Sequence, residues 1–196
     1  MKLGLFLMPS HPPERSPYDA QQWDLKCLRM ADRYGLHEAW IGEHFTAPWE
    51  PVPSPDILIA QALMQTKNIK LGTGTVNMPN HHPAMVAAEV AMVDHMAEGR
   101  FLFGISPGGL MSDAEVFGNL DNDRTEMFVE AINQVLTIWE GDAPYNLKGK
   151  YWNITTEKTM IPSLGQGFIN KSYQKPHPPI VVTAVAPFSK GVTAAA

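Results

Sequence analysis

Residues 93–109, VDHMAEGRFLFGISPGG, decide the fold class of this chain. They join the end of a helical pattern to an apolar run over 100–106, with Gly99 between the two as a typical helix stop. The run is short and is followed by a turn that contains two glycines, which is the pattern of a buried strand. A helix that leads directly into a buried strand predicts a parallel sheet covered by helices.

The same alternation continues on both sides of this segment. We expect strands over 2–8, 38–42, 69–76, 100–106 and 179–184, and helices over 19–34, 55–66, 83–99, 124–140 and from Pro187 onward. The first four strands start 36, 31 and 31 residues apart, a spacing that predicts right-handed βαβ units. Residues 141–178 interrupt this rhythm, so we expect an irregular insertion there, with a possible strand over 151–155.

Two α/β architectures fit this order, a doubly wound open sheet and a (β/α)8 TIM-type barrel. No glycine fingerprint follows the first strand, which argues against the dinucleotide-binding version of the open sheet and favours the barrel. A barrel needs eight strands and usually about 250 residues. We therefore expect residues 1–196 to form a single domain that holds the first five units of an incomplete barrel, as the front portion of a longer protein. A short open-sheet protein is the alternative.

The composition excludes several classes of protein. With 15 basic and 20 acidic residues and a hydrophobic fraction of 44%, the chain is neither disordered nor a basic nucleic-acid binder. No apolar run approaches the roughly 20 residues that span a bilayer, and no signal peptide is evident, so we expect no membrane association. The single cysteine, Cys27, permits no internal disulfide, which favours a cytoplasmic location.

Apolar periodicity also predicts which helix faces are buried. For the first helix we expect a buried face made of Trp23, Cys27, Met30, Ala31 and Tyr34. The helices over 55–66 and 83–97 are apolar on more than one side, and the second carries an extra stripe at Met85, Ala88, Met92 and Met96. A second apolar face usually packs against another chain, so we expect a homodimer through these two helices. A wide core-facing stripe padded with methionine is the alternative.

Four of the seven histidines, His11, His44, His81 and His82, follow predicted strands. In parallel α/β folds this edge carries the active site. A metal site would need carboxylates among them, but only Glu43 adjoins His44, and neighbouring strand residues point in opposite directions. We therefore expect no metal and choose His44 as the residue that carries chemistry. The glycine turn after the fourth strand and the start of the last helix are candidate anion or ring contacts.

Several segments together resemble the N-terminal part of the bacterial-luciferase-like, flavin-dependent monooxygenases. The segments are 38–45 (EAWIGEHF), 71–83 (LGTGTVNMPNHHP), 93–109 and 114–118 (AEVFG), in family order. Within this family, the segments 38–45 and 71–83 resemble the limonene-monooxygenase branch. The resemblance implies that His44 is the catalytic residue near the reactive edge of a flavin. It also implies a cis peptide bond between Gly74 and Thr75, against which the flavin ring packs.

The resemblance further implies a set of cofactor-binding positions: Gly74, Thr75, Asn77, Ser106, Pro107, Gly108, Asp113, Val185, Ala186 and Ser189. Some of these depart from the luciferases. Ser106 stands where they carry a cysteine, Pro107 replaces a basic residue, and Val185 and Ala186 replace polar phosphate ligands. The resemblance implies FMN as the cofactor. The departures leave only Ser189 and backbone N–H groups to serve a phosphate at the last helix, so we expect a lower cofactor affinity, with FAD as the alternative cofactor.

The implied activity is that of a monooxygenase. Reduced FMN from a separate flavin reductase and O2 would oxygenate a small hydrophobic substrate, for example one resembling a terpene, with His44 as general acid or base. One alternative is an enzyme of the same fold that transfers hydride with a deazaflavin. A second alternative is a flavin-binding fragment without catalytic activity.

Overall fold

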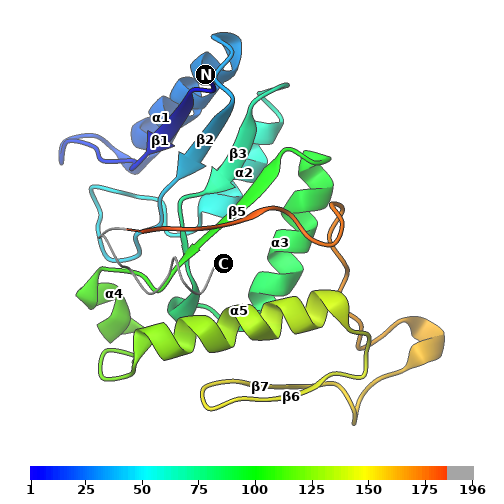
Figure 1. Cartoon of the computed structure of the whole chain (residues 1–196). Coiled ribbons are helices and arrows are strands. Elements are labelled where there is room, and N and C mark those ends of the chain that lie inside the picture. The colour runs from blue at the N-terminus through cyan, green and yellow to red at the C-terminus, as the bar shows by residue number, and fades with distance from the viewer. Residues whose placement is uncertain (185–196) are drawn as a thin grey trace.

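A computed structural model describes residues 1–184 and shows strands alternating with helices (Figure 1). The expectations for Val185, Ala186, Ser189 and a helix from Pro187 lie outside these residues. The strands are β1 (Gly4–Leu7), β2 (Glu38–Ile41), β3 (Lys70–Thr73), β4 (Val76–Asn77), β5 (Phe101–Ser106), β6 (Asn146–Lys148), β7 (Asn153–Thr155) and β8 (Ile180–Val182). The helices are α1 (Pro17–Arg33), α2 (Pro55–Leu63), α3 (Pro83–Ala97), α4 (Met111–Val116) and α5 (Arg124–Glu140), with short 3-10 turns η1 (Met78–Asn80) and η2 (Pro162–Leu164).

The main sheet is parallel, as the βαβ spacing predicts. It runs β1–β2–β3–β5, and β8 pairs with β5 on the side away from β4. The single strand expected over 69–76 is divided into β3 and β4, and the peptide bond between Gly74 and Thr75, which lies between them, is cis. Both halves pair with β5, so the five expected strand positions are present.

The two faces of this sheet differ. Alternate residues such as Leu71, Phe101 and Phe103 are fully buried in the core with the helices. On the opposite face Phe6, Trp40, Gly72 and Leu102 lie side by side across four strands. Phe6 is 58% exposed there, so in the described part of the chain this face remains open. A parallel sheet with helices on one face only corresponds to part of the wall of a TIM-type barrel, and the open face corresponds to the inside of that barrel.

The prediction for the buried face of α1 was wrong in most positions. Its buried residues are Ala20, Asp24, Leu25, Leu28 and Ala31. Trp23 and Tyr34 are 48% and 70% exposed. The helix is rotated because a charged residue, Asp24, is buried and bonded to His11, while Trp23 packs against the cations of Arg15 and Lys26. Ser16 caps the helix by accepting a hydrogen bond from the backbone N–H of Asp19.

The region 141–178 is more regular than expected. β7 lies inside the possible strand over 151–155, but it pairs with β6, which the sequence did not indicate. The carboxylate of Glu130 on α5 accepts hydrogen bonds from the backbone N–H groups of Lys150, Tyr151 and Trp152, and so fixes the turn of this hairpin. The short helix α4 was also missed, because it lies in what appeared to be a glycine-rich loop.

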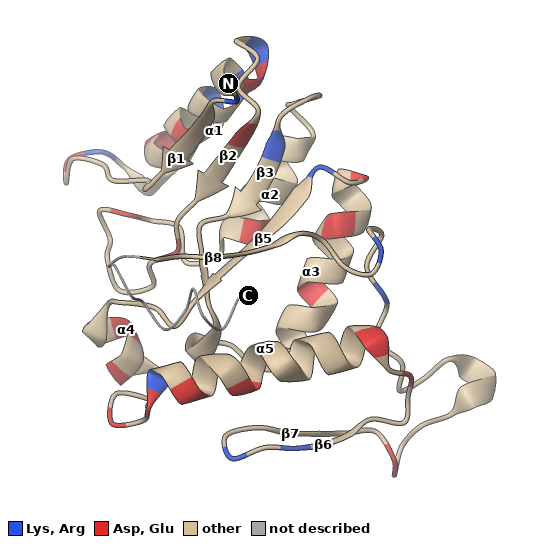
Figure 2. Ribbon diagram, in the orientation of Figure 1, with Lys and Arg blue, Asp and Glu red and all other residues tan. Residues whose placement is uncertain are grey.

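The second apolar stripes on α2 and α3 lie on the surface. Ile57 on α2 is 69% exposed, Met64 directly after α2 is 84% exposed, and Met92 on α3 is 66% exposed. This exposure contradicts the alternative in which the methionines pad a wide core-facing stripe. Charged side chains lie mostly on the helices and connecting segments, and few are on the strands (Figure 2).

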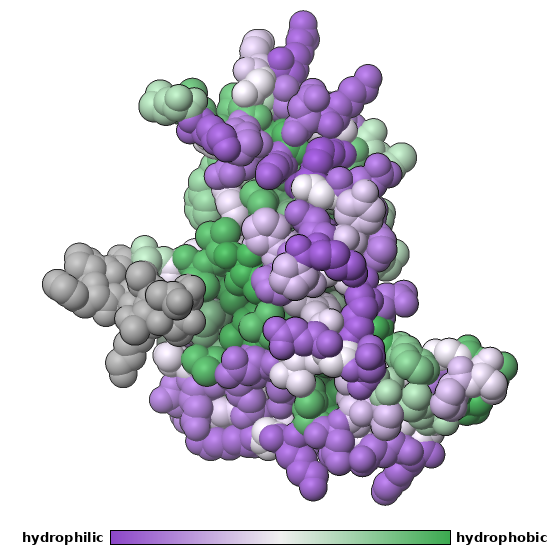
Figure 3. All heavy atoms as spheres, turned by 45° about the vertical axis from the view of Figure 1, so that its right-hand side comes forward, coloured by the Kyte–Doolittle hydropathy of each residue, from purple (hydrophilic) through white to green (hydrophobic). Residues whose placement is uncertain are grey.

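An apolar area lies in the middle of the face shown in Figure 3, between hydrophilic surfaces above and below it. No helix in residues 1–184 combines the length and the apolar character that crossing a membrane requires.

Candidate functional site

The carboxyl ends of the parallel strands bring most of the predicted site residues to one edge. His44 follows β2, Asn77 ends β4, and Ser106 ends β5. Parallel pairing places these ends side by side, with Asn77 directly opposite Ser106. The rim expected from the sequence is therefore present in the fold.

A buried cluster of hydroxyl and amide groups joins the cis segment to the glycine turn. The hydroxyl of Thr75 donates to Ser106 Oγ (2.8 Å), and the hydroxyl of Ser106 donates to Asn77 Oδ1 (2.8 Å). The backbone N–H of Gly108 also donates to Ser106 Oγ (3.0 Å). Thr75, Asn77 and Ser106 are each at most 8% exposed. Ser106 therefore fixes the relative positions of two strand ends and the turn that follows.

Glu43 joins this cluster to β2 from within the protein. Its Oε1 accepts from the backbone N–H of Asn77 (3.2 Å), and its backbone oxygen accepts from Asn77 Nδ2 (3.2 Å). His81 Nε2 donates to the same carboxylate at 3.0 Å. Burial alone would lower the pKa of His81, but the hydrogen bond and charge of Glu43, with the charges of Glu89 and Asp56, raise it overall.

His44 lies beside this buried group, with a side chain that is 27% exposed. Its Nδ1 is hydrogen-bonded to a carboxylate that sequence reasoning overlooked, that of Glu50. Glu43 and His44 thus engage different partners, as expected for neighbouring residues that point in opposite directions. Within residues 1–184 no group of three or more His, Cys, Asp or Glu side chains is placed to hold a metal ion.

Asp113, predicted as a cofactor contact, bonds to the segment just after His44. Its carboxylate accepts hydrogen bonds from the backbone N–H groups of Phe45 (3.1 Å) and Thr46 (2.8 Å), and from the Thr46 hydroxyl (2.5 Å). Asp113 is only 1% exposed. These contacts make Asp113 a positioning residue for the loop that carries His44, and its contact with a cofactor stays a prediction.

Arg124, the first residue of α5, is a site residue that sequence reasoning missed. Its Nη2 donates to the backbone oxygen of Pro107 (2.7 Å), and its Nε is buried without a partner among the described residues. Gly108 has a left-handed φ of 73°, and a Cβ there would lie 2.5 Å from Arg124 Nη2. Burial lowers the pKa of Arg124, and the charge of Asp113 opposes this shift. The sequence did contain one indication of this role, because Arg124 is the first residue of the next long helix after the glycine turn.

Trp40 covers the open face of the sheet just below this edge. A Cβ at Gly72 would lie 2.6 Å from the ring of Trp40, so the strand next to Trp40 needs glycine at that position. The indole N–H donates to Glu38 Oε1 (3.2 Å), which holds the ring over the neighbouring strand. The site therefore has an aromatic floor.

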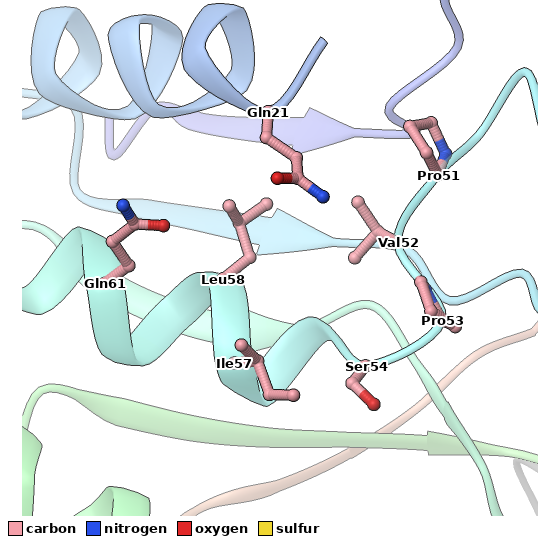
Figure 4. Close-up of a pocket in the computed structure, with 8 residues that line it drawn as sticks. All are labelled: Gln21, Pro51, Val52, Pro53, Ser54, Ile57, Leu58 and Gln61. Carbon is pink, nitrogen blue, oxygen red and sulfur yellow. The ribbon is translucent and has the colours of Figure 1, made fainter. Parts of the chain in front are cut away.

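A separate hollow of about 190 Å³ lies between α1, α2 and the segment 51–54 (Figure 4). It is lined by Gln21, Pro51, Val52, Pro53, Ser54, Ile57, Leu58 and Gln61. None of the predicted catalytic or cofactor-binding residues is among them. This hollow is distinct from the strand-end site.

Comparison with known proteins agrees with the sequence motifs. A family profile described as luciferase-like monooxygenase matches residues 1–196. A 4-hydroxyprotoasukamycin monooxygenase of Streptomyces nodosus subsp. asukaensis is 36% identical over 144 residues, which are 74% of this chain and 39% of that protein. Limonene 1,2-monooxygenase of Rhodococcus erythropolis is 37% identical over 139 residues, which are 71% of this chain and 36% of that protein. The chain thus spans well under half the length of these relatives.

Solved structures show the same fold. The oxygenating constituent of 3,6-diketocamphane monooxygenase from Pseudomonas putida, in complex with FMN, has a TM-score of 0.84 and 29% identity, covering 94% of this chain and 51% of that one. An F420-dependent secondary alcohol dehydrogenase has a TM-score of 0.73 at 22% identity, which shows the fold alone. The family profile and the curated relatives agree, and this chain belongs to the luciferase-like monooxygenase family.

Proposed function

We propose that this chain supplies the flavin-binding part of a flavin-dependent monooxygenase, with His44 as its catalytic residue. The observation that carries this proposal is the continuous contact from β2 to β5. Glu43, next to His44, bonds to Asn77, and Asn77 bonds to Ser106. An imidazole and a glycine turn therefore share one strand edge, where a flat cofactor ring would meet both.

The described residues fit FMN. Arg124 is half-buried, its buried Nε is unpartnered, and it forms no ion pair within residues 1–184, so a phosphate would complete its contacts. Gly74, Thr75, Ser106, Pro107 and Gly108 would hold the ring, and Val185, Ala186 and Ser189 stay predictions for the phosphate. The FMN in the diketocamphane enzyme supports this choice over FAD or a deazaflavin.

The residues of this chain would orient the cofactor and handle a proton, while reduced flavin would supply the electrons that activate O2. His44 is partly exposed at the edge and would give or take a proton at its free ring nitrogen during oxygen transfer. The apolar face next to it, with Phe6 and Trp40, would accept a small hydrophobic substrate and limit access of water.

Three further parts of the proposal concern partners and location. Reduced flavin would come from a separate flavin reductase. A homodimer would form through the exposed apolar residues of α2 and α3, which otherwise remain in water. Cys27 is the only cysteine, which supports a reducing, cytoplasmic location, and fractionation of the producing cells would check this.

The proposed function is tested by flavin binding and oxygen uptake. FMN fluorescence should be quenched on titration with the protein, and reduced FMN with a cyclic ketone or terpene should give substrate-dependent O2 consumption. Substituting His44→Gln should leave binding in place and abolish product formation. Reduction of a deazaflavin by an alcohol without oxygen uptake would favour the hydride-transfer alternative, and absence of flavin binding would overturn the proposal.

A further inference from the structure

We propose that Glu50 is a positioning residue for His44. Its carboxylate accepts a hydrogen bond from the Nδ1–H group of His44, which keeps the proton on Nδ1 and makes Nε2 the nitrogen that exchanges protons. The inference deepens the proposed function, because it takes His44 as the acid or base. Its principal test needs no flavin, so it can fail while the proposed function stands, and the reverse also holds.

The contacts of the Glu50 carboxylate determine which partner donates in its hydrogen bond with His44. One carboxylate oxygen is bonded to His44 Nδ1, and the other accepts from the hydroxyl of Ser10. The Glu50 side chain is 12% exposed. An ionised carboxylate can only accept, so Nδ1 must carry the proton. The neutral ring then has its free lone pair on Nε2.

The backbone around Glu50 also fixes its distance from His44. The backbone N–H of His44 donates to the oxygen of Val52 (3.2 Å), and the N–H of Val52 donates to the oxygen of Glu50 (2.7 Å). The loop after β2 therefore folds back so that Glu50 returns to His44. Asp113 holds the same loop from the other side through Phe45 and Thr46.

The turn that carries Glu50 is anchored to α1 through His11. The backbone N–H of His11 donates to the oxygen of Trp49 (2.7 Å). Arg15 can only donate, so His11 Nδ1 accepts from it (3.0 Å), and His11 Nε2 donates to the fully buried Asp24 (3.1 Å). Two imidazoles are thus held in defined tautomers, His11 by Arg15 and Asp24, and His44 by Glu50. This places Glu50 on a rigid support.

The test is the tautomer of His44, read from the ring 15N signals of the whole 196-residue chain at a pH where the ring is neutral. His44→Gln identifies the signals by their loss. In the unchanged protein Nδ1 should be the protonated nitrogen and Nε2 the free one. Glu50→Ala should remove this preference, and Glu50→Gln should retain part of it, because its amide oxygen still accepts.

Controls separate positioning from general damage. Glu14→Gln alters an exposed carboxylate three residues after His11 in the sequence and should leave the His44 signals unchanged. Unchanged signals from the other six histidines show that the variants are folded. A His44 ring that is protonated on Nε2 in the unchanged protein, or that keeps the Nδ1–H tautomer in Glu50→Ala, would overturn the proposal.

A second readout applies to the flavin-loaded protein. Glu50→Ala should lower kcat severalfold, because only the fraction of His44 that still carries its proton on Nδ1 can take a proton at Nε2. The FMN dissociation constant should change less than about twofold, because Glu50 is not among the proposed flavin contacts. Equal losses in kcat and in FMN affinity would instead show a collapsed site and contradict a positioning role.

Discussion

The hydroxyl of Ser106 donates a hydrogen bond to the amide oxygen of Asn77 at 2.8 Å, across the paired ends of β5 and β4. The hydroxyl oxygen of Ser106 in turn accepts hydrogen bonds from the hydroxyl of Thr75 and from the backbone N–H of Gly108. A single small side chain therefore joins the cis segment, a strand end and the glycine turn, and this makes it the most sensitive structural position of the site.

Substituting Ser106→Ala should destabilise the protein. The change removes the acceptor of the Gly108 N–H and the Ser106 donor of Asn77 Oδ1, and it leaves the buried Thr75 hydroxyl with only a long contact to Asn77 Oδ1 (3.4 Å). Leaving such groups unpaired costs about 1–3 kcal/mol of unfolding free energy. Urea denaturation measures the loss, and Ser163→Ala, at an exposed serine, is the matched control. Equal stability of the two variants would contradict the proposed role of Ser106.

Substituting Arg124→Gln should weaken binding of FMN much more than binding of riboflavin, which lacks the phosphate. A charge-assisted contact contributes about 1.5–3 kcal/mol, so the FMN affinity should fall by about 10-fold to 100-fold. Fluorescence titration of both ligands measures the difference. Arg33→Gln, at an exposed arginine on α1, should change neither affinity. Parallel losses for both flavins would show that Arg124 supports the turn rather than a phosphate.

Substituting Asp113→Asn should loosen the loop that carries His44. The amide would present N–H groups to the backbone donors of Phe45 and Thr46 in place of one carboxylate oxygen. Loss of hydrogen bonds to a charged, buried group should reduce the unfolding free energy by about 1.5–3 kcal/mol. Hydrogen exchange of the Phe45 and Thr46 amides should accelerate, while Asp121→Asn, at an exposed position, should leave both measurements unchanged. Slow exchange in Asp113→Asn would reject this role.

Much of the fold was predictable because its signals are local. The apolar runs and the regular spacing of strand starts identify the parallel sheet without any knowledge of contacts. The buried face of α1 was not predictable, because Asp24 is buried only through its bond to His11, a residue from another segment. The strand β6 is short and has little apolar character, so its pairing with β7 depends on Glu130 rather than on its own pattern.

The placement of the candidate site residues was predictable for residues at the ends of strands. It was not predictable for residues that reach the same edge from a loop or from the start of a helix. His44, Asn77 and Ser106 follow from strand ends, and the family resemblance adds the cis bond at Gly74. Glu50 and Arg124 reach the same edge from a loop and from a helix start. Their contacts depend on how the chain turns in space, and no spacing rule in the sequence contains that information.

The pair formed by His81 and Glu43 predicts a pH dependence of stability. The pKa of His81 is raised in the folded protein, so its contribution should be complete below the unfolded pKa of about 6.5 and lost as the pH rises through the folded pKa. The difference in unfolding free energy between the unchanged protein and His81→Gln should therefore shrink from pH 6 to pH 9. Denaturation at several pH values measures it, with His37→Gln as the control. A difference that grows with pH would have the wrong sign.

The exposed methionines predict how the chain associates. Met92 is 66% exposed in the middle of α3, and Met64 is 84% exposed at the end of α2. Single exposed apolar side chains are common on protein surfaces, but a group of them on neighbouring helices is typical of an interface. If two copies pack through α2 and α3, a charge at Met92 would have to be buried without a partner, which is strongly unfavourable. Met92→Glu should therefore convert a dimer to a monomer in sedimentation equilibrium. Met30→Glu places the same charge on an exposed residue of α1 and should leave the dimer intact, because α1 is outside the proposed interface. A monomeric unchanged protein, or dissociation by both substitutions alike, would show that this surface has another use.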